Sequence, residues 1–485
     1  WKKYVLPYVL ESSIILEQES YLRVDPGVIV KIWDRNPADG NFIGFDIFGP
    51  QGTPPLPPGA TFIADSQGGE RIVFTSFKDD TVAGDTNADL DFSKPVPGEW
   101  RGFSIDGQDA DVNVRLSGVD IKYAGLSESS LPRINWYTRG AVYITNSSPT
   151  IENTLIDASA SNGIVVARLS NPLRTNPILR TISFTRMGKF PLVVPITVFR
   201  PGNAIEDNLN FYPADPLLRN TFPAVAIYYG RVPASLGVLL LRAFRTGEQK
   251  VPYVLLGRIL VEAQAELKIA EGVIVKFADA EHMLFVPSTE DPILASACPG
   301  AVILNCLVVD GLLTSLGTDP NRVVFTSFKD DSAAGDTNGD GGATLPERGD
   351  WGTIHIKTRI TGILRHTEIR YGGGALNAAI VFEGPNEFAA LFTFEKSSVH
   401  HNLNNGIIGT NQFQLKISEV EVFENRFFNP AQPLNKTFWQ GSGIVVSNSP
   451  TRIEKTSVFR HPDWGIDVNT TTQVHLDAVN IYQNG

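Results

Sequence analysis

Two stretches of this chain gather acidic and amide side chains at spacings that suit a divalent cation. Residues 325–341 read FTSFKDDSAAGDTNGDG and residues 74–90 read FTSFKDDTVAGDTNADL, identical at 13 of 17 positions. Oxygen atoms at alternate positions of a tightly wound loop converge on one centre, which is the coordination that calcium prefers. Without a cation, carboxylates this close repel one another. The duplication indicates that the chain contains the same chemistry twice.

The second stretch fits the calcium-loop pattern D-x-[DN]-x-[DN]-G-x₅-E. The oxygens that the pattern requires belong to Asp336, Asn338, Asp340 and Glu347. Gly341 permits the sharp turn at the sixth position. Just upstream, Asp330 and Asp331 either add ligands to the same ion or hold a second one. The sequence therefore predicts a calcium loop at 330–347, placed after a strand rather than between two helices.

The first stretch forms a corresponding loop at 79–91 with a less complete ligand set. Its oxygen-bearing residues are Asp79, Asp80, Asp85, Asn87, Asp89 and Asp91. Leu90 replaces the glycine of the pattern and Val96 replaces its closing glutamate. We therefore expect a weaker site, or one that another group such as Glu99 completes. For both loops the alternative is that the aspartates cap turns by bonding their own backbone, within a solvated acidic loop.

The composition is that of a folded protein rich in strands and turns. The 485 residues are 42% hydrophobic and 19% charged, with 43 Gly and 32 Pro, which excludes a disordered chain and favours turns. The formal net charge of −11 repels phosphate backbones and anionic lipid surfaces. No apolar run approaches the roughly 20 residues of a transmembrane helix. We therefore expect calcium as a partner, with no nucleic acid and no transmembrane segment.

The cysteines and the chain ends bear on the compartment. Cys298 and Cys306 are the only cysteines, and the seven residues between them include a Pro-Gly turn that can close a hairpin disulfide. The alternative is two buried thiols. The chain starts at Trp1 without a secretory leader and stops at Gly485. We expect both ends to be cuts through a longer or processed polypeptide.

An internal repeat organises the whole chain. PYVL occurs at 7–10 and again at 252–255, an offset of 245 residues, and IKYAG matches IRYGG at an offset of 248. Self-similarity at a nearly fixed spacing is the signature of a repeat architecture. The sequence therefore predicts two copies of one unit, at 1–248 and 249–485.

Within each copy the pattern is that of β-strands. Hydrophobic residues alternate with others, as at Val28, Val30 and Ile32, and this period of two indicates strands with one buried face. Asn-Gly-Ile turns recur, and the 23 residues from Gly140 to Gly163 are the size of one coil of a parallel β-helix. We therefore predict an all-β parallel β-helix, a solenoid whose tandem copies form an elongated rod, with helices rare. The alternative is a pair of tandem β-sandwich domains.

The order of these pieces resembles the right-handed parallel β-helix repeats, of the pectin-lyase-like fold, in large secreted proteins of the bacterial cell surface. The second copy has LKIAEGVIVKF, GLLTSLGTDPNRVVFTS, the acidic loop and PERGDWGTIHI in that order. The first copy has GATFIADSQGGERIVFTS, its acidic loop and PVPGEWRGFSI. The resemblance covers residues 4–125 and 250–375, and it implies an extracellular or cell-surface location.

These observations favour a calcium-stiffened structural or adhesive protein, such as a filament or surface-layer subunit. Because the acidic residues come in two near-identical loops, structural ions explain them better than one catalytic centre does. The alternatives are a polysaccharide lyase or glycoside hydrolase, and a non-catalytic carbohydrate-binding module. Trp100 and Trp351 are expected to pack over the loops, or, in a glycan-binding protein, to form a platform for sugars. Expected partners are further copies, neighbouring modules of a longer chain, or glycans.

Overall fold

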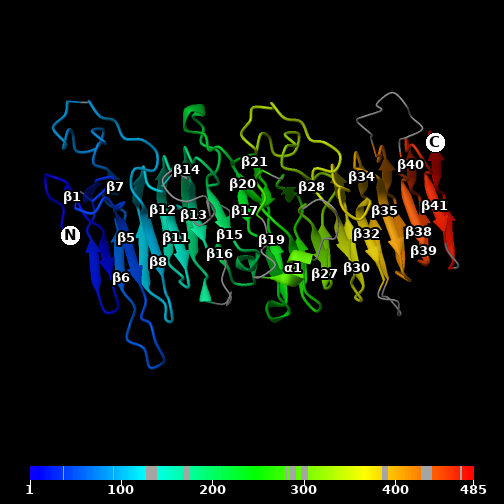
Figure 1. The fold of residues 1–485 in the computed structure, drawn as a ribbon, viewed down its shortest axis with the longest axis horizontal. Helices are drawn as coiled ribbons and strands as arrows, with labels where there is room; N and C mark the ends of the chain where they lie inside the picture. Colours follow the sequence, from blue (N-terminus) through cyan, green and yellow to red (C-terminus); the bar gives the residue numbers. More distant parts are fainter. Residues whose placement is uncertain are drawn as a thin grey trace. The chain divides into compact units, whose positions relative to one another are not determined.

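The structure, a computed structural model, is a parallel β-helix (Figure 1). Short strands stack in parallel as successive coils, and among the described strands β20 and β21 form the antiparallel exception. This confirms the predicted all-β solenoid and excludes tandem β-sandwiches, whose sheets are antiparallel. The structure describes residues 1–36, 38–90, 92–126, 139–167, 174–206, 208–279, 281–284, 291–296, 304–384, 391–427, 440–469 and 472–485.

The chain divides into two compact units. The first comprises residues 1–198, 202–226 and 244–251, and the second comprises 199–201, 227–243 and 252–485. The repeated sequences form strands in both units. Residues 8–10 and 29–32 of the first unit correspond to residues 253–255 and 274–277 of the second. Each unit also sends its acidic loop out from the body of its own coil stack (Figure 1).

The first unit arranges its strands on three faces. One face orders β1 (Tyr8–Leu10), β4 (Ile29–Ile32), β7 (Ile72–Ser76) and β10 (Val119–Lys122). The second orders β2 (Ile14–Leu16), β5 (Gly44–Phe48), β8 (Gly102–Asp106), β11 (Gly140–Thr145), β13 (Asn162–Val166), β15 (Leu192–Val194) and β17 (Val225–Ile227). The third orders β3 (Tyr21–Val24), β6 (Thr61–Asp65) and β9 (Asn113–Ser117).

A long strand joins the first and third faces of this unit. β12 (Thr150–Asp157) pairs with β9 through its first half and with β10 through its second half. β14 (Ile178–Thr185) then pairs with β12, and β16 (Ala204–Ile205) pairs with β14. The remaining elements are η4 (Ile196–Phe199), η5 (Pro216–Leu218), β20 (Phe244–Thr246) and β21 (Gln249–Val251).

The second unit keeps its three faces separate. The face that matches the first face of unit one orders β22 (Tyr253–Leu255), β25 (Ile274–Phe277), β28 (Val323–Ser327), β31 (Thr367–Arg370), β34 (Ser398–His400), β37 (Glu421–Phe423), β40 (Ser457–Phe459) and β43 (Asn480–Tyr482). The next orders β18 (Gly230–Val232), β23 (Ile259–Val261), β26 (Leu307–Val309), β29 (Ile354–Ile356), β32 (Ala378–Glu383), β35 (Asn405–Thr410), β38 (Ile444–Ser447) and β41 (Ile466–Asn469). The last orders β19 (Val238–Leu241), β24 (Glu266–Ile269), β27 (Leu312–Leu316), β30 (Gly362–Arg365), β33 (Phe392–Glu395), β36 (Leu415–Ser418), β39 (Thr451–Glu454) and β42 (Val474–Asp477).

The core of each unit consists of hydrophobic rows that the parallel register aligns. In the first unit Val30, Phe74 and Ile121 occupy one row and are fully buried. In the second unit Val275 and Phe325 occupy the matching row. Neighbouring strands lie about 4.8 Å apart, so side chains of one row contact each other directly. The predicted alternation is thus confirmed, because every second residue of these strands faces the core.

Buried asparagines satisfy backbone groups where coils turn. Asn402 is 0% exposed and donates to the carbonyls of Ile369 and His400 and to the side-chain oxygen of Asn425. Asn425, also buried, donates in turn to the carbonyl of Val399. Buried polar groups need such partners, because an unpaired one costs roughly 1–3 kcal/mol. Asparagine at the corners therefore bonds one coil to the next.

The irregular elements of the second unit are short. They are η6 (Ala234–Leu236) and α1 (Pro292–Ser296). In the part of the chain that the structure describes, no helix has the length and apolar character needed to cross a membrane. Cys306 forms a disulfide. The other cysteine of the sequence, Cys298, lies outside the described residues.

Candidate metal centres in the acidic loops

Each acidic loop lies over an outward-facing row of side chains. In the first unit β4 and β7 place Lys31 beside Thr75, and β10 continues the row with Lys122. Lys31 follows the core residue Val30 and so points away from the core, yet it is 0% exposed because the loop covers it. Its Nζ donates to the carbonyl of Gly84 at 2.7 Å. A lysine on the outer face of the sheet therefore holds the loop backbone in place.

The second unit repeats this arrangement with more contacts. Lys276 is 0% exposed and donates to the carbonyls of Asp330 at 2.9 Å and Gly335 at 3.2 Å, and to the hydroxyl of Thr337 at 2.7 Å. Burial lowers the pKa of Lys276 to about 8, although the charges of the loop aspartates oppose this shift. The fold thus buries a cation under the loop, and loop oxygens replace the water that the cation has lost.

The first aspartate of each Asp-Asp pair binds to the sheet. Asp79 is 0% exposed and accepts hydrogen bonds from Thr75 at 2.6 Å and from Lys122 at 3.2 Å. Burial alone would raise the pKa of Asp79, but these bonds lower it. Asp330 accepts from Nε of Arg370 at 2.8 Å in the same way. Both side chains are therefore committed to fixing the loop to the strands.

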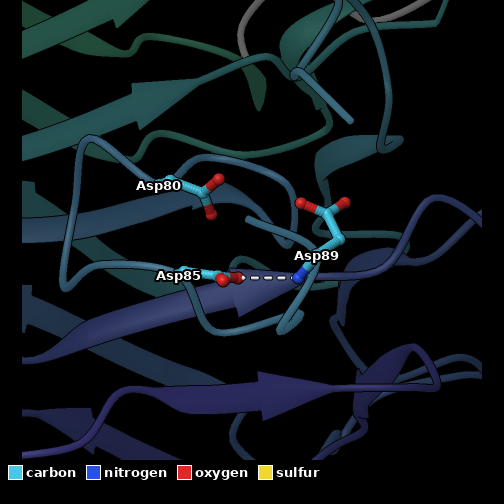
Figure 2. Close-up of side chains that lie close together, drawn as sticks. All are labelled: Asp80, Asp85 and Asp89. Carbon is cyan, nitrogen blue, oxygen red and sulfur yellow. Dashed lines mark hydrogen bonds between the residues drawn. The ribbon is translucent and has the colours of Figure 1, made fainter. Parts of the chain in front are cut away.

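The second aspartate of each pair joins two aspartates of the loop. In the first unit the three carboxylates that meet belong to Asp80, Asp85 and Asp89, which surround a common space (Figure 2). In the second unit they belong to Asp331, Asp336 and Asp340. In each group one oxygen of every carboxylate lies within 4.8 Å of the others. Three converging carboxylates offer a hard cation such as calcium the oxygen ligands that it prefers.

The loop backbone winds around the middle aspartate of each group. Asp85 accepts hydrogen bonds from the backbone N–H groups of Asp89 at 3.1 Å and Leu90 at 3.0 Å. Asp336 accepts from the equivalent N–H groups, including that of Gly341 at 2.9 Å. Leu90 and Gly341 both have a positive φ, 54° and 67°. In this left-handed conformation the Cβ of leucine is sterically strained, whereas glycine has no Cβ. The backbone of the first loop is therefore the more strained of the two.

One asparagine in each loop has a side-chain oxygen that accepts no hydrogen bond from the described residues. The amide nitrogen of Asn87 donates to Asp89 at 2.9 Å and to Ser93 at 3.0 Å. Asn338 makes the same pair of bonds, to Asp340 at 2.8 Å and to Thr344 at 3.0 Å. The Oδ1 atoms of both asparagines are buried and accept no hydrogen bond from the described residues. A buried oxygen without a donor is costly unless it has another partner, and a cation is one.

The carboxylates of the second loop lie close enough to disfavour one another's negative charge. Burial, together with the nearby charges of Asp336 and Asp340, raises the pKa of Asp331 above its usual value. Asp331 therefore resists ionisation in the fold, and its ionised form at neutral pH lowers the stability of the loop. A bound dication removes both causes, because it replaces lost solvation and screens the repulsion.

Two other acidic groups considered from the sequence lie outside the clusters. Glu347 is exposed and is not part of the carboxylate cluster, and its backbone N–H donates to Asp350. Glu99 is 6% exposed and binds Lys78 at 2.7 Å, so it does not complete the first loop. Asp91 lies outside the described residues. Within the described chain, then, the two clusters have the same three-carboxylate composition.

The two tryptophans after the loops belong to the core. Trp100 and Trp351 are both 0% exposed, so the interpretation of them as a sugar-stacking platform is wrong. Trp351 stacks on Phe277 with ring centroids 4.1 Å apart and an interplanar angle of 6°. Trp100 contacts Phe103 edge to face, at 5.8 Å. Both indoles therefore lie inside the coil beneath the loop, rather than over it.

The buried lysines are not among the residues predicted from the sequence. A signal was present, since both copies place lysine within an otherwise apolar strand, as VIVKI and VIVKF. In an alternating strand the outward phase of Lys31 and Lys276 favours solvent exposure, which is usual for lysine. Only the loop, which returns over the sheet, makes these positions buried. Repetition of an unusual charge in both copies was the available clue.

Replacing Lys276 by methionine should loosen the second loop. The change removes the ammonium that binds three loop oxygens, and we expect the free energy of unfolding to fall by roughly 1–3 kcal/mol, the cost of leaving buried acceptors unpaired. Amide hydrogen exchange should become faster across 330–341. Lys268→Met is the matched control, since Lys268 is a part-exposed lysine of the same unit. Equal exchange in the two variants would contradict the role of Lys276.

Comparison with known proteins finds no family for this chain. No protein-family model matches it, and no curated protein sequence matches it significantly. Among solved structures, the crystal structure of the periplasmic alginate epimerase AlgG is similar with a TM-score of 0.24 and 9% sequence identity, over 85% of this chain and 77% of that one. A likeness this low says nothing about what this chain binds or does.

Proposed function

We propose that this chain is a structural or adhesive protein of the cell surface, a β-helix that calcium stiffens at its two acidic loops. The observation that supports the proposal most is duplication. Both units repeat the buried lysine, the sheet-bound aspartate and the cluster of three carboxylates. A catalytic centre gains little from a second identical copy, whereas a structural ion is useful in each loop that needs support.

The chemistry of the clusters favours calcium over softer metals. The candidate ligands in both loops are carboxylate and amide oxygens, and no histidine or cysteine joins either cluster of described residues. Oxygen-only sites suit hard cations, and nitrogen or sulfur ligands suit zinc and copper. Calcium sites of extracellular modules bind weakly, with Kd of about 10⁻⁴–10⁻³ M. A part-exposed loop site is consistent with that range and with use outside the cell.

The end of the second unit supports association with a neighbour. β41, β42 and β43 are the outermost strands of their sheets. Their exposed side chains include Leu476 (52%), Val468 (46%) and Tyr482 (47%). Edge strands with apolar side chains pair readily with a further strand. We infer that these exposed strands contact another copy of the chain.

Electron microscopy of the purified chain in calcium and in chelator tests this function. We expect filaments or sheets in calcium and separate molecules in chelator, because calcium relieves the repulsion between the loop carboxylates and so stiffens the units that associate. Asp331→Asn should reduce calcium-dependent assembly. Separate molecules in both conditions would contradict a self-assembling surface protein.

A further inference from the structure

A groove of about 930 Å³ lies on the second unit, outside the sheet that contains β23, β26, β29 and β32. Its floor is one outward-facing row of the sheet. The parallel register places Leu260, Val308 and His355 side by side in this row. All three are buried, at 3%, 0% and 5% exposure. Two of these three side chains are apolar, and all three are shielded from water although the row faces away from the core.

A short helix forms one wall of the groove and is firmly held. α1 begins after Asp291, whose carboxylate accepts from the backbone N–H of Leu294 at 2.9 Å. The same carboxylate binds Arg231 of β18 through two hydrogen bonds of 2.6 and 2.8 Å. Arg258 also donates to the carbonyl of Ala295. These bonds fix the helix over the sheet, so the wall is preformed.

The polar side chains on the floor form ion pairs or hydrogen bonds with one another or with adjacent residues, except at one ring nitrogen of His355. Lys357 binds Asp310 at 2.9 Å. His355 Nε2 lies 2.7 Å from a carboxylate oxygen of Glu383, and Asn411 donates to the other oxygen at 3.1 Å. Burial lowers the pKa of His355, so the ring is neutral at pH 7 and donates its Nε2 proton to Glu383. Its Nδ1 is then a buried acceptor for which the described residues supply no donor.

The groove is also lined by a charge that forms no ion pair with the described residues. Arg359 is exposed and makes no ion pair with any residue that the structure describes. Beside it, Ile360 is 43% exposed, and its backbone N–H donates to the buried hydroxyl of Thr358 at 3.0 Å. Ile293 of α1, which also lines the groove, is 58% exposed. A cation that forms no ion pair with the described residues thus lines the groove together with two exposed apolar side chains, on a protein whose net charge is −11.

We propose that this groove binds a small organic acid with an apolar body. Its acid group pairs with Arg359, and its body lies between Ile293 and Ile360 above the Leu260–Val308 floor. A hydroxyl or amide donor on the ligand supplies the hydrogen bond that His355 Nδ1 lacks. Charge complementarity favours an acid group, because Arg359 is a cation of the groove that forms no ion pair with the described residues. The apolar side chains of Leu260 and Val308 disfavour a ligand that is polar on all sides.

Fluorescence titration of the full chain with two matched probes tests this proposal. The probes are 1-anilinonaphthalene-8-sulfonate and N-phenyl-1-naphthylamine, which share an apolar body and differ in the acid group. We expect Arg359→Glu to weaken sulfonate binding about fivefold or more, the effect expected for loss of one charge contact, and to leave the neutral probe unchanged. Lys455→Glu, at an exposed lysine outside the groove, is the control. Equal binding of the sulfonate to wild type and Arg359→Glu would overturn the proposal.

Hydrogen exchange and competition locate the site and identify the ligand class. Bound sulfonate should slow exchange in residues 354–360, and protection confined to other segments would overturn the assignment. Naphthoate should displace the probe, because it has an acid group and an apolar body. Displacement by glucuronate in its place would overturn the apolar part of the proposal. Ile360→Ser, an exposed position that leaves the core intact, should weaken both probes.

Discussion

In calcium, the wild-type chain should unfold at a clearly higher temperature than in chelator. An ion that binds only the folded state adds about 2.7 kcal/mol per site at 100 times its Kd. For a unit of this size that corresponds to roughly 5–10 °C in melting temperature. The physical reason is that calcium compensates charges that the loops hold together at a cost. Thermal unfolding followed by circular dichroism in calcium and in chelator measures the shift.

Asp331→Asn separates this explanation from simple turn capping. Oδ1 of Asp331 is buried and accepts no hydrogen bond from the described residues, and the pKa of Asp331 is raised by burial and by neighbouring carboxylates. Removing its charge should therefore raise the melting temperature slightly in chelator, because repulsion is relieved. In calcium it should lower the melting temperature, because a ligand is lost. An aspartate that only stabilised a turn would give a loss in both conditions.

Matched controls remove a carboxylate charge outside the loop. Glu421→Gln and Asp477→Asn remove two exposed carboxylates of the same unit that lie outside the cluster. Their calcium-dependent shift should equal that of the wild type. Calorimetric titration should find two binding events in the wild type and one in Asp331→Asn. A full shift in Asp331→Asn would show that calcium binds elsewhere.

Much of the fold follows from the sequence because the repeat and the strand period are local signals. Alternation at Val28, Val30 and Ile32 predicts one buried face, and stacking of equal coils turns that pattern into rows such as Val30 and Phe74. The joining of two faces by β12 was not predictable. It depends on one strand of eight residues that pairs with two different neighbours, and nothing in its composition distinguishes it from shorter strands.

The candidate site was only partly predictable for a different reason. The motif groups ligands by spacing, and spacing does not show which way a side chain turns. Asp79 and Asp80 are adjacent, yet the first binds Thr75 and Lys122 of the sheet, while the second faces the loop cluster. That division depends on cations from strands far away in sequence. A pattern confined to one loop cannot contain this information.

Trp351→Ala should destabilise the second unit more than any single loop substitution. The indole is fully buried, stacks on Phe277 at 4.1 Å, and donates to the carbonyl of Arg370 at 3.0 Å. Gly372 packs so closely that a Cβ there would lie 2.5 Å from the ring. Removing a buried tryptophan costs about 3–5 kcal/mol, since the cavity cannot close completely. Urea unfolding in chelator measures the loss.

Trp464→Ala is the control for this prediction, since Trp464 is 66% exposed and should cost no more than about 0.5 kcal/mol. The Trp351→Ala substitution should also disturb the position of the loop. Arg370, whose carbonyl accepts from the indole, holds Asp330 through its side chain, and in the first unit Trp100 and Lys122 have the same relation to Asp79. Calcium affinity should therefore fall in Trp351→Ala and stay unchanged in Trp464→Ala. Unchanged affinity in both would mean that the core and the loop are independent.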